Sequence, residues 1–393
     1  MKLLILHASA GGGHRRAAEA LAVAAETAGH TTVVRDILDF TPPLYRRTYA
    51  RGYLALIRSA PELWGYFYAH SDRSAQTPVE RRVRAAFNQL NALSLARVFR
   101  RAEPDAVLCT HFLPLELVSN LPTRIRRNRP LFGIVTDFAA HSLWFCRNVD
   151  AYFVATEEAR RQLIRKGQPA DGVQVTGIPV MPGFVPDRDP ADARRQLGLS
   201  ADVPAVLVLN GGLGVGPALE LLRTAVHAPP PCQWMVVIGR NPRLEARVRS
   251  AAAQVSAPVT VHGFVDHLHD WMAAADLIVT KPGGLTMAEA LAMGKPTLLM
   301  DPIPGQEQRN AEHLLEAGAS VRAFEPEEAL WKIEALLGDR PRLDALASAS
   351  RRLGRPQAAK HILRDAVLRA TAGAGSILPT AGPIPPLPPA SRR

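Results

Sequence analysis

The sequence predicts an α/β protein with two domains, each built on a parallel sheet, that face each other across a cleft. Short apolar segments alternate with helix-length segments within residues 1–178, and the same alternation begins again within residues 191–353. A proline-rich stretch at residues 179–190 separates the two series and suits a linker. At 393 residues the chain exceeds the length that one core usually supports. Two domains are therefore expected.

Each expected strand is a run of three to five mostly apolar residues, many of them β-branched. In the first half these runs are residues 3–6, 32–35, 106–109, 132–136, 152–155 and 173–176, and in the second half 205–209, 234–238, 259–262, 277–279 and 297–300. Strands that alternate with helices form parallel sheets covered on both faces, so both domains should be Rossmann-like.

The end of the chain divides into two parts. Helical patterns continue to residue 372, and residues 354–372 form the last of them. Residues 373–393 are rich in proline, glycine and small residues, a composition that favours disorder.

The charge, the cysteine content and the apolar stretches of the sequence indicate where in the cell the protein is expected. The net charge is +11, and most of it lies in residues 1–178, where 24 Lys and Arg accompany 15 Asp and Glu. The three cysteines have no metal-binding spacing and favour a reducing compartment. We find no signal-peptide pattern and no uninterrupted apolar stretch that could cross a membrane, so synthesis and retention in the cytoplasm are expected.

Residues 280–310 contain the most informative motif of the chain. Gly283 and Gly284 end the apolar run at residues 277–279, and a helix should begin directly after them. The free backbone N–H groups of its first turn would favour a phosphate. Thr286 adds a hydroxyl group, and Glu289, one turn further on the same face, has two acceptor oxygens suited to a ribose diol.

A second strand-to-helix turn follows at residues 301–305. After it, Gln306, Glu307 and Asn310 supply polar groups that can bind sugar hydroxyls. Two neighbouring turns of this kind converge on one ligand at the carboxyl edge of a sheet. The alternative is an ordinary pair of turns whose glycines serve only the backbone.

The first strand is followed by the sequence Gly11-Gly12-Gly13-His14-Arg15. Consecutive glycines let backbone N–H groups approach a ligand, while His14 stands at the start of an alanine-rich helix. A helix N-terminus disfavours imidazolium, which lowers the pKa of the histidine and keeps a neutral base available near pH 7. The alternative is a histidine that merely caps the helix.

A second candidate base is Asp137, which follows the apolar run at residues 132–136. His141 and Trp144 lie three residues apart and would share one face of a helical turn. An aspartate N-cap followed by a packed aromatic residue explains the same pattern without any ligand.

Taken together, these motifs resemble glycosyltransferase family 28. The pattern PGG-x-T-x-x-E followed by PGQE-x-x-N resembles the nucleotide-sugar half of that family. GGGHR and TD-x-x-x-H-x-x-W resemble its diacylglycerol glycosyltransferases, which comprise bacterial processive glucosyltransferases and plant-type monogalactosyldiacylglycerol synthases. The resemblance implies the GT-B arrangement of two Rossmann-like domains, with the last helix crossing back onto the first domain. It also implies that Gly13, His14 and Arg15 lie at the cleft beside acceptor and donor phosphate.

Three further turns of the second half suit the donor. Gly211 and Gly212 follow the strand at residues 205–209 and suit a pyrophosphate. Arg240 could pair with the diphosphate, and the resemblance implies that the turn with Phe264 and Val265 binds uracil through its backbone.

We expect neither a metal nor another cofactor. The only Asp-x-Asp sequence considered, residues 187–189, lies between prolines in the linker and not at a strand end. Helix N-termini and Arg240 would meet the charge of the leaving group.

Residues 42–101 combine 11 arginines with only three acids and include Tyr66 and Phe67 among several aromatic residues. Such a mixture suits the interface of an anionic bilayer. A solvated basic helix with buried aromatics is the alternative, and a nucleic-acid site would need a recognition motif that is not found. We prefer the membrane interpretation, with Tyr66, Phe67, Arg15, His141 and Trp144 on the acceptor side.

The leading hypothesis is an inverting hexosyltransferase that moves glucose or galactose from a UDP-sugar to 1,2-diacylglycerol. His14, or else Asp137, would remove the proton of the glycerol hydroxyl. The enzyme would be cytoplasmic and peripherally attached to the inner face of the cell membrane. The alternatives are a GlcNAc transferase acting on an undecaprenyl-linked acceptor, and a non-catalytic sugar-nucleotide-binding protein at the membrane.

Overall fold

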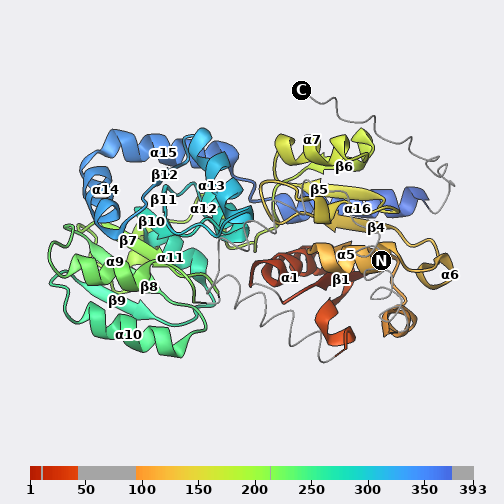
Figure 1. The fold of residues 1–393 in the computed structure, drawn as a ribbon, viewed down its shortest axis with the longest axis horizontal. Coiled ribbons are helices and arrows are strands. Elements are labelled where there is room, and N and C mark those ends of the chain that lie inside the picture. The colour runs from red at the N-terminus through yellow and green to blue at the C-terminus, as the bar shows by residue number, and fades with distance from the viewer. Residues whose placement is uncertain (10–11, 43–93, 213, 374–393) are drawn as a thin grey trace, which may run out of the picture.

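Two parallel sheets, one in each domain, organise the molecule (Figure 1). The computed structural model describes residues 1–9, 12–42, 94–212 and 214–373. Both sheets have six strands whose described pairings are all parallel, which confirms the predicted α/β class. Tyr66, Phe67 and the tail beyond residue 373 lie outside the described residues.

The first sheet has the strand order β2-β1-β3-β4-β5-β6. Its strands are β1 (Lys2–His7), β2 (Thr31–Asp36), β3 (Ala106–Cys109), β4 (Leu131–Ile134), β5 (Ala151–Val154) and β6 (Val173–Val175). The elements around them are α1 (Gly12–Thr27), α5 (Phe112–Ser119), α6 (Thr123–Arg126), α7 (Glu157–Arg165), the 3₁₀ turns η1 (Ile37–Phe40), η2 (Ser142–Trp144) and η3 (Ala170–Gly172), and helical residues 94–102.

The second sheet has the order β12-β11-β10-β7-β8-β9. Its strands are β7 (Ala205–Leu209), β8 (Gln233–Val237), β9 (Val259–His262), β10 (Leu277–Thr280), β11 (Thr297–Leu299) and β12 (Ser320–Arg322). The helices are α8 (Pro190–Gln196), α9 (Ala218–Ala225), α10 (Pro242–Ala252), α11 (Leu268–Ala274), α12 (Gly284–Ala292), α13 (Gln306–Glu316), α14 (Pro326–Gly338), α15 (Arg340–Leu353) and α16 (Ala358–Gly373).

Both faces of each sheet are buried, as continuous apolar strands require. In the first domain, α1 and α16 cover one face, and α5, α7 and residues 94–102 cover the other. In the second domain, α8, α11, α12 and α13 cover one face, and α9, α10, α14 and α15 cover the other. Each strand therefore contributes alternate residues to two cores.

Helix α16 belongs in space to the first domain, although it follows the second domain in sequence (Figure 1). Its residues Ile362 and Ala366 are buried against α1 and the strands of the first sheet. The chain thus passes between the domains twice. The two passages touch, because a Cβ atom at Gly177 would lie 2.5 Å from Cβ of Arg355.

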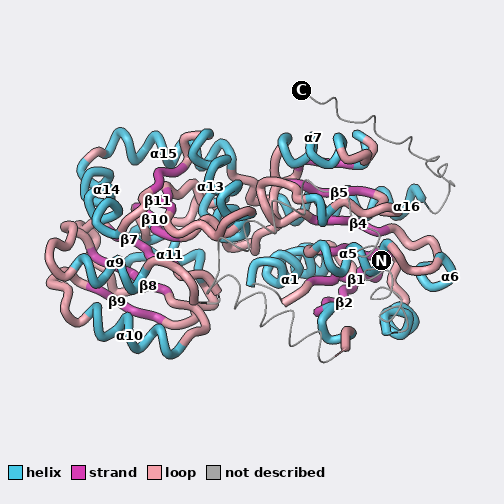
Figure 2. Tube along the Cα trace, viewed as in Figure 1, coloured by secondary structure: helices cyan, strands magenta, loops and turns pink. Residues whose placement is uncertain are grey.

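The strand orders determine where a ligand should bind. In the first sheet the order changes direction between β1 and β3, and in the second between β7 and β10. Parallel α/β sheets bind ligands at the carboxyl ends of such neighbouring strands. Figure 2 shows loops and helix ends at the boundary between the two domains. His14 follows β1, and Gly211 and Lys281 follow β7 and β10.

A candidate active site between the two domains

His14 is held by hydrogen bonds that reach the ends of two other strands. Its Nδ1 atom lies 3.0 Å from the carbonyl oxygen of Thr110, after β3, and 2.8 Å from Oγ1 of Thr136, after β4. A carbonyl oxygen can only accept, so Nδ1 carries the proton of the neutral ring. Nε2 then presents its lone pair, and no described residue hydrogen bonds to it.

The surroundings of His14 keep it neutral. Its pKa is lowered to about 4, first by burial and then by His7, while the hydrogen bond to Thr110 opposes the shift. The direction is the predicted one, and burial is its largest cause. Thr110 Oγ1 also donates to the backbone carbonyl of His14 at 2.8 Å. The ring is thus fixed, neutral and able to accept a proton at one nitrogen.

Two further histidines, not singled out from the sequence, surround this ring. His111 packs edge-on against His14 with centroids 4.4 Å apart, and its Nδ1 accepts from the N–H of Leu113 at 3.0 Å. Burial, then His14, lowers the pKa of His111 well below its usual value. His7 is also buried, and its Nδ1 atom has no partner among the described residues.

Asp137 lies at a contact between the domains. Asn310 on α13 donates from Nδ2 to Oδ1 of Asp137 at 3.0 Å and to the carbonyl oxygen of Pro282 at 3.1 Å, while its Oδ1 accepts from the N–H of Phe138 at 2.9 Å. Burial raises the pKa of Asp137, opposed by Asn310 and Lys281. Phe138 itself stacks on His313 and lies in the core of the second domain.

Glycines allow the domains to approach closely at this point. A Cβ atom at Gly284 would lie 2.2 Å from the carbonyl oxygen of Thr136, and one at Gly13 would lie 3.4 Å from Cβ of Leu285. Gly12 and Gly212 face each other in the same way. The glycines after β1 and those of the Pro-Gly-Gly turn therefore permit close contact between the domains, in addition to forming the turns themselves.

Glu289 is the buried carboxyl group of the donor side. It is 5% exposed, and no described residue donates a hydrogen bond to it. Burial raises its pKa to about 8, and Arg16 opposes the shift. Thr286, one turn before it on α12, is half-buried. A buried carboxyl group without a partner costs free energy unless a ligand supplies donors, which suits the predicted ribose diol.

Lys281 is a site residue that sequence reasoning missed. Its ammonium group forms an ion pair with Glu307, whose other oxygen accepts from the N–H of Ile303 at 3.0 Å. The predicted sugar ligand Glu307 is thus engaged in this structure, and the neighbouring Gln306 is half-buried. The signal in the sequence was a lysine directly before the Pro-Gly-Gly turn, at the end of a central strand.

The remaining predicted donor residues lie on neighbouring turns. Gly211 has a φ of 65°, which favours glycine, and stands beside Gly212 at the end of β7. Arg240 is exposed, and its guanidinium lies 4.1 Å from the ring centroid of Phe264, itself 41% exposed. Val265 packs against the core of the second domain.

His141 and Trp144, two of the residues predicted on the acceptor side, are buried within the first domain. Trp144 is 3% exposed and packs in the core of the first domain, 6.3 Å from the ring of Phe112. His141 is buried too, and its Nδ1 accepts from the N–H of Leu143 as the N-cap of η2. A short 3₁₀ turn has replaced the helical face that we expected. Arg15 is exposed and forms an ion pair with Glu19.

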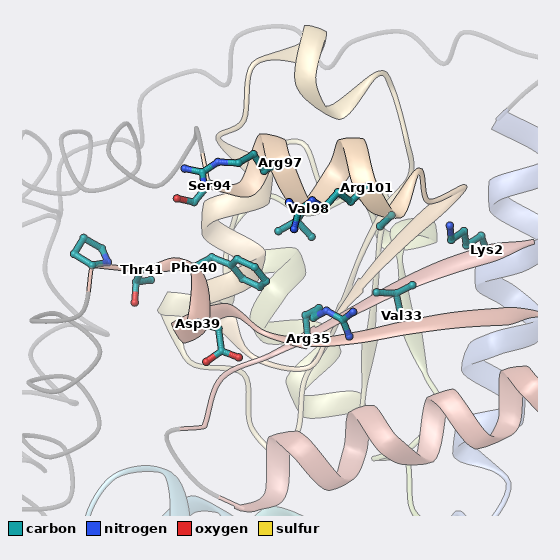
Figure 3. Close-up of a pocket in the computed structure, with 12 residues that line it drawn as sticks. Lys2, Val33, Arg35, Asp39, Phe40, Thr41, Ser94, Arg97, Val98 and Arg101 are labelled. Carbon is teal, nitrogen blue, oxygen red and sulfur yellow. The ribbon is translucent and has the colours of Figure 1, made fainter.

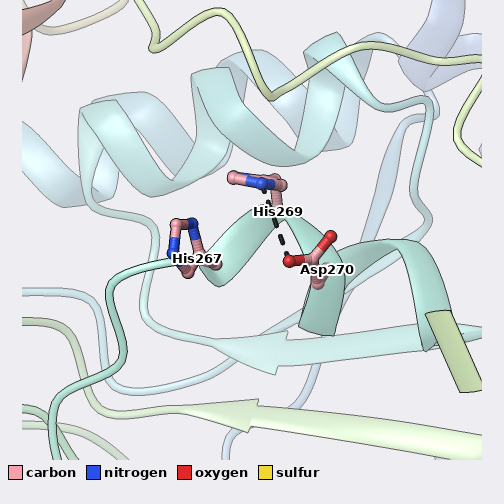
Figure 4. Close-up of side chains that lie close together, drawn as sticks. All are labelled: His267, His269 and Asp270. Atoms are coloured by element: carbon pink, nitrogen blue, oxygen red, sulfur yellow. Dashed lines mark ion pairs between the residues drawn. The ribbon is translucent and has the colours of Figure 1, made fainter. Parts of the chain in front are cut away.

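Two residues of the Asp-x-Asp sequence in the linker, Arg188 and Asp189, have partners within the protein. Oδ1 of Asp189 accepts from the N–H of Ala191 at 2.9 Å and caps α8, and Arg188 pairs with Asp270. Asp270 also approaches His267 and His269, and the ligand atoms of these three lie within 4.8 Å of one another (Figure 4). The pairing with Arg188 and the N-terminal position on α11 both disfavour a cation there.

A pocket of about 610 Å³ opens at the edge of the first sheet. Figure 3 shows Arg97 and Arg101 on the helical residues 94–102, opposite Arg35 of β2. Lys2 adds a fourth cation, and the acid at the site is Asp39. Its apolar part consists of Val33, Phe40, Val98 and Ala102. Five residues of this pocket belong to residues 42–101, the basic region predicted to face a membrane: Pro42, Ser94, Arg97, Val98 and Arg101. No helix of the described residues is long and apolar enough to span a bilayer.

Two family models match the chain. Residues 14–180 match monogalactosyldiacylglycerol (MGDG) synthase, and residues 148–366 match UDP-N-acetylglucosamine 2-epimerase. The first match covers nearly all of the first domain, including His14. The second covers the end of the first domain and nearly all of the second.

Curated relatives match both domains together. A processive diacylglycerol beta-glucosyltransferase of Bacillus mycoides is 29% identical over 98% of this chain and 97% of its own. The protein of that name from Bacillus cereus is 30% identical over 93% of each chain. Among solved structures, MurG of Acinetobacter baumannii superimposes with a TM-score of 0.62 and 18% identity, over 94% of this chain and 99% of its own. At that identity the likeness shows the fold, and it confirms the GT-B arrangement.

Proposed function

Since this chain belongs to the family of the processive diacylglycerol β-glucosyltransferases, within glycosyltransferase family 28, we propose that it transfers glucose from UDP-glucose to 1,2-diacylglycerol. The glycolipid product would carry a β-linked sugar. Because the donor is an α-linked glycosyl phosphate, a β-linked product requires inversion at C1. The names of the relatives favour glucose over galactose.

One observation carries this proposal: a neutral histidine and an unpartnered carboxyl group lie on α1 and α12, two helices that contact each other across the domain boundary. His14 comes from the first domain, and Glu289 from the second. Both stand next to glycine turns at the carboxyl ends of central strands, where α/β sheets bind nucleotides. A base on one side and a nucleotide site on the other are what a transferase of this kind needs.

His14 is the proposed general base. The glycerol hydroxyl gives its proton to Nε2 while its oxygen attacks C1 of the sugar from the side opposite the diphosphate. Nδ1–H stays bonded to the carbonyl oxygen of Thr110, which orients the ring and stabilises the imidazolium that forms. His111 packs against the ring and keeps it from rotating.

Asp137 is the weaker candidate for the base. One of its oxygens already accepts from Asn310 across the domain boundary. The residue on its carboxyl side is buried in the second domain. We propose that Asp137 holds the two domains together in the closed state, and that its substitution affects the approach of donor and acceptor more than proton removal.

The donor is proposed to bind without a metal. The N-terminal turn of α12 offers backbone N–H groups to a phosphate, and Glu289 is suited to the ribose diol. The match of residues 148–366 to a UDP-N-acetylglucosamine 2-epimerase model supports a sugar nucleotide in this half. Activity that survives a chelator would support metal independence.

Membrane contact is proposed for the first domain. The pocket beside β2 combines four cationic side chains with an apolar floor, which suits anionic lipid at a bilayer surface. The enzyme would attach peripherally to the inner face of the membrane and draw diacylglycerol from it. Flotation with vesicles of increasing anionic lipid content would test this attachment.

The function is tested by supplying purified protein with diacylglycerol liposomes and, separately, UDP-glucose, UDP-galactose and UDP-GlcNAc. Mass and sugar analysis of the lipid products should identify a β-glucosyl diacylglycerol with the first donor. Preference for UDP-GlcNAc and an undecaprenyl-linked acceptor would favour the alternative transferase. Binding of UDP without turnover of any donor would indicate a non-catalytic protein.

A further inference from the structure

Lys281 occupies the central position of the donor side. It directly follows β10, and the register pairs Thr280 of that strand with Leu209 of β7. Lys281 and Asn210 therefore extend neighbouring strands at the point where the strand order of the second sheet reverses. This is the position at which α/β sheets place the phosphates of a nucleotide.

The side chain of Lys281 crosses to the glycine turn of the neighbouring strand. A Cβ atom at Gly211 would lie 3.5 Å from its Cε atom. Asn210 is fully buried at the base of the same turn, and its Nδ2 donor has no partner among the described residues. A cation thus stands beside the glycine turn at the carboxyl end of β7, where an acceptor-rich ligand is expected.

Glu307 holds the ammonium group of Lys281 through an ion pair. The ion pair is largely buried, with side-chain exposures of 17% for Lys281 and 6% for Glu307. The carboxylate is itself fixed by the N–H of Ile303 at 3.0 Å. A buried cation requires such a partner. Because the ion pair already fixes the position of the ammonium group, no reorganisation is needed when charge develops on a ligand.

Arg240 is less suited to the role that the sequence predicted for it. It is exposed and stacks on Phe264, on the turn that follows β9. Lys281 instead lies at the centre of the converging turns, close enough to Asp137 to influence its carboxyl group.

We infer that Lys281 contacts the diphosphate of the donor and stabilises the charge of the departing UDP, a role that rests on the proposed function. As the glycerol oxygen bonds to C1, the bond from C1 to the phosphate oxygen breaks, and its electron pair stays on that oxygen. The proton of the hydroxyl goes to His14. The ammonium of Lys281 keeps its own protons and donates a hydrogen bond to the diphosphate, while Glu307 keeps it in place.

The test compares UDP with uridine, which lacks the phosphates, by calorimetry. Replacing Lys281→Met should weaken UDP binding by about 10- to 100-fold, the usual worth of a charge-assisted hydrogen bond, and leave uridine binding unchanged. Turnover should fall by about 100- to 1,000-fold, and Lys281→Arg should recover part of it. Lys332→Met is the matched control, because Lys332 also pairs with a glutamate but lies on α14.

A parallel loss of UDP and uridine affinity, or an unchanged UDP affinity, would overturn the inference. If Lys281→Met does not fold, Glu307→Gln tests it instead: UDP should then bind more weakly than to the wild type, with uridine binding unchanged, because the ammonium loses the carboxylate that keeps it in place. Unchanged UDP affinity in that variant also counts against the inference. Wild-type protein that binds UDP through Lys281 but glycosylates no lipid would refute the proposed function alone.

Discussion

The two sides of the cleft carry different kinds of titratable groups. The first domain contributes His7, His14 and His111, and burial lowers the pKa of all three. The second contributes Glu289, with its pKa raised to about 8, and the ion pair of Lys281 with Glu307. Besides the carboxyl group of Asp137, the first side holds imidazoles that stay neutral, and the second holds carboxyl and ammonium groups.

This difference matches the two halves of a transfer reaction. A neutral imidazole can take the proton of a hydroxyl acceptor, and charged or easily charged groups can bind the hydroxyls and phosphates of a nucleotide sugar. Burial lowers the pKa of the histidines and raises that of Glu289, because it disfavours the charged form of each group. Substitutions in the first domain should therefore lower the rate of proton removal, whereas substitutions in the second domain should weaken the binding of the nucleotide sugar.

The largest effect is expected for His14→Ala. Loss of a general base should lower kcat by about 100- to 10,000-fold, with UDP affinity retained because the donor side is intact. Asp137→Asn should reduce kcat less, since it keeps a polar group opposite Asn310. Steady-state kinetics with calorimetry of UDP would check both. A near-normal kcat for His14→Ala, with a severe loss for Asp137→Asn, would transfer the base to Asp137.

The approach of the two sides is tested by Gly284→Ala. The added methyl group would meet the carbonyl oxygen of Thr136 at 2.2 Å, so the domains could not close fully. Misplacement of about 1 Å can cost about 100-fold in rate, and we expect a loss of that order in kcat/KM. Gly338→Ala is the control, because a Cβ atom there meets nothing within 4 Å. Equal kinetics for both variants would contradict the close contact.

A smaller effect is expected at Glu289, and it depends on pH. Burial raises the pKa of Glu289 to about 8, and two ribose hydroxyls would stabilise the carboxylate and lower that value. Binding then releases a proton, so affinity should rise as pH increases towards 8, by at most about tenfold per pH unit, and level off above. Uridine titrations from pH 6 to 9 would measure it.

The matched variant for this pH dependence is Glu289→Gln, which should bind uridine more weakly and show no such dependence. An analogue of uridine without the ribose diol should show none with the wild type either. If the glutamine variant kept the wild-type slope, another group would be responsible for it.

The smallest effect is expected outside the cleft, at Asp189. Because this carboxylate caps α8, Asp189→Ala should lower the free energy of unfolding by about 1 kcal/mol. Turnover should not change, with or without a chelator. Urea unfolding and activity assays would check this. A loss of activity that added metal restores would instead assign a metal to the Asp-x-Asp sequence.

Local patterns predicted the fold well because strands and turns are local. Eleven of the strands were expected close to their observed positions, and only β12 was not, since Ser320–Arg322 is short and half polar. Helix α12 begins at Gly284, directly after the predicted turn. Glycine-rich turns and apolar runs indicate the local backbone conformation directly, without knowledge of contacts far away in the sequence.

Contacts between the domains could not be predicted in this way. Phe138 follows a strand of the first sheet but is buried in the second domain, and Asn310 binds Asp137 at a distance of 173 positions in the chain. Trp144 looked like an acceptor residue, because its spacing from His141 fits a helical face. The actual 3₁₀ turn buries it. Lys281 was missed because its partner, Glu307, lies on α13, 26 positions further along the chain.

The return of α16 to the first domain has a mechanical consequence. Because the chain crosses between the domains twice, and the crossings touch at Gly177 and Arg355, the two connections act as one hinge. Such a hinge permits rotation about a line through these residues and resists sliding and twisting. Opening would then be widest at the rim farthest from this line. A substrate that enters from a bilayer would find the same two surfaces realigned each time the cleft closes.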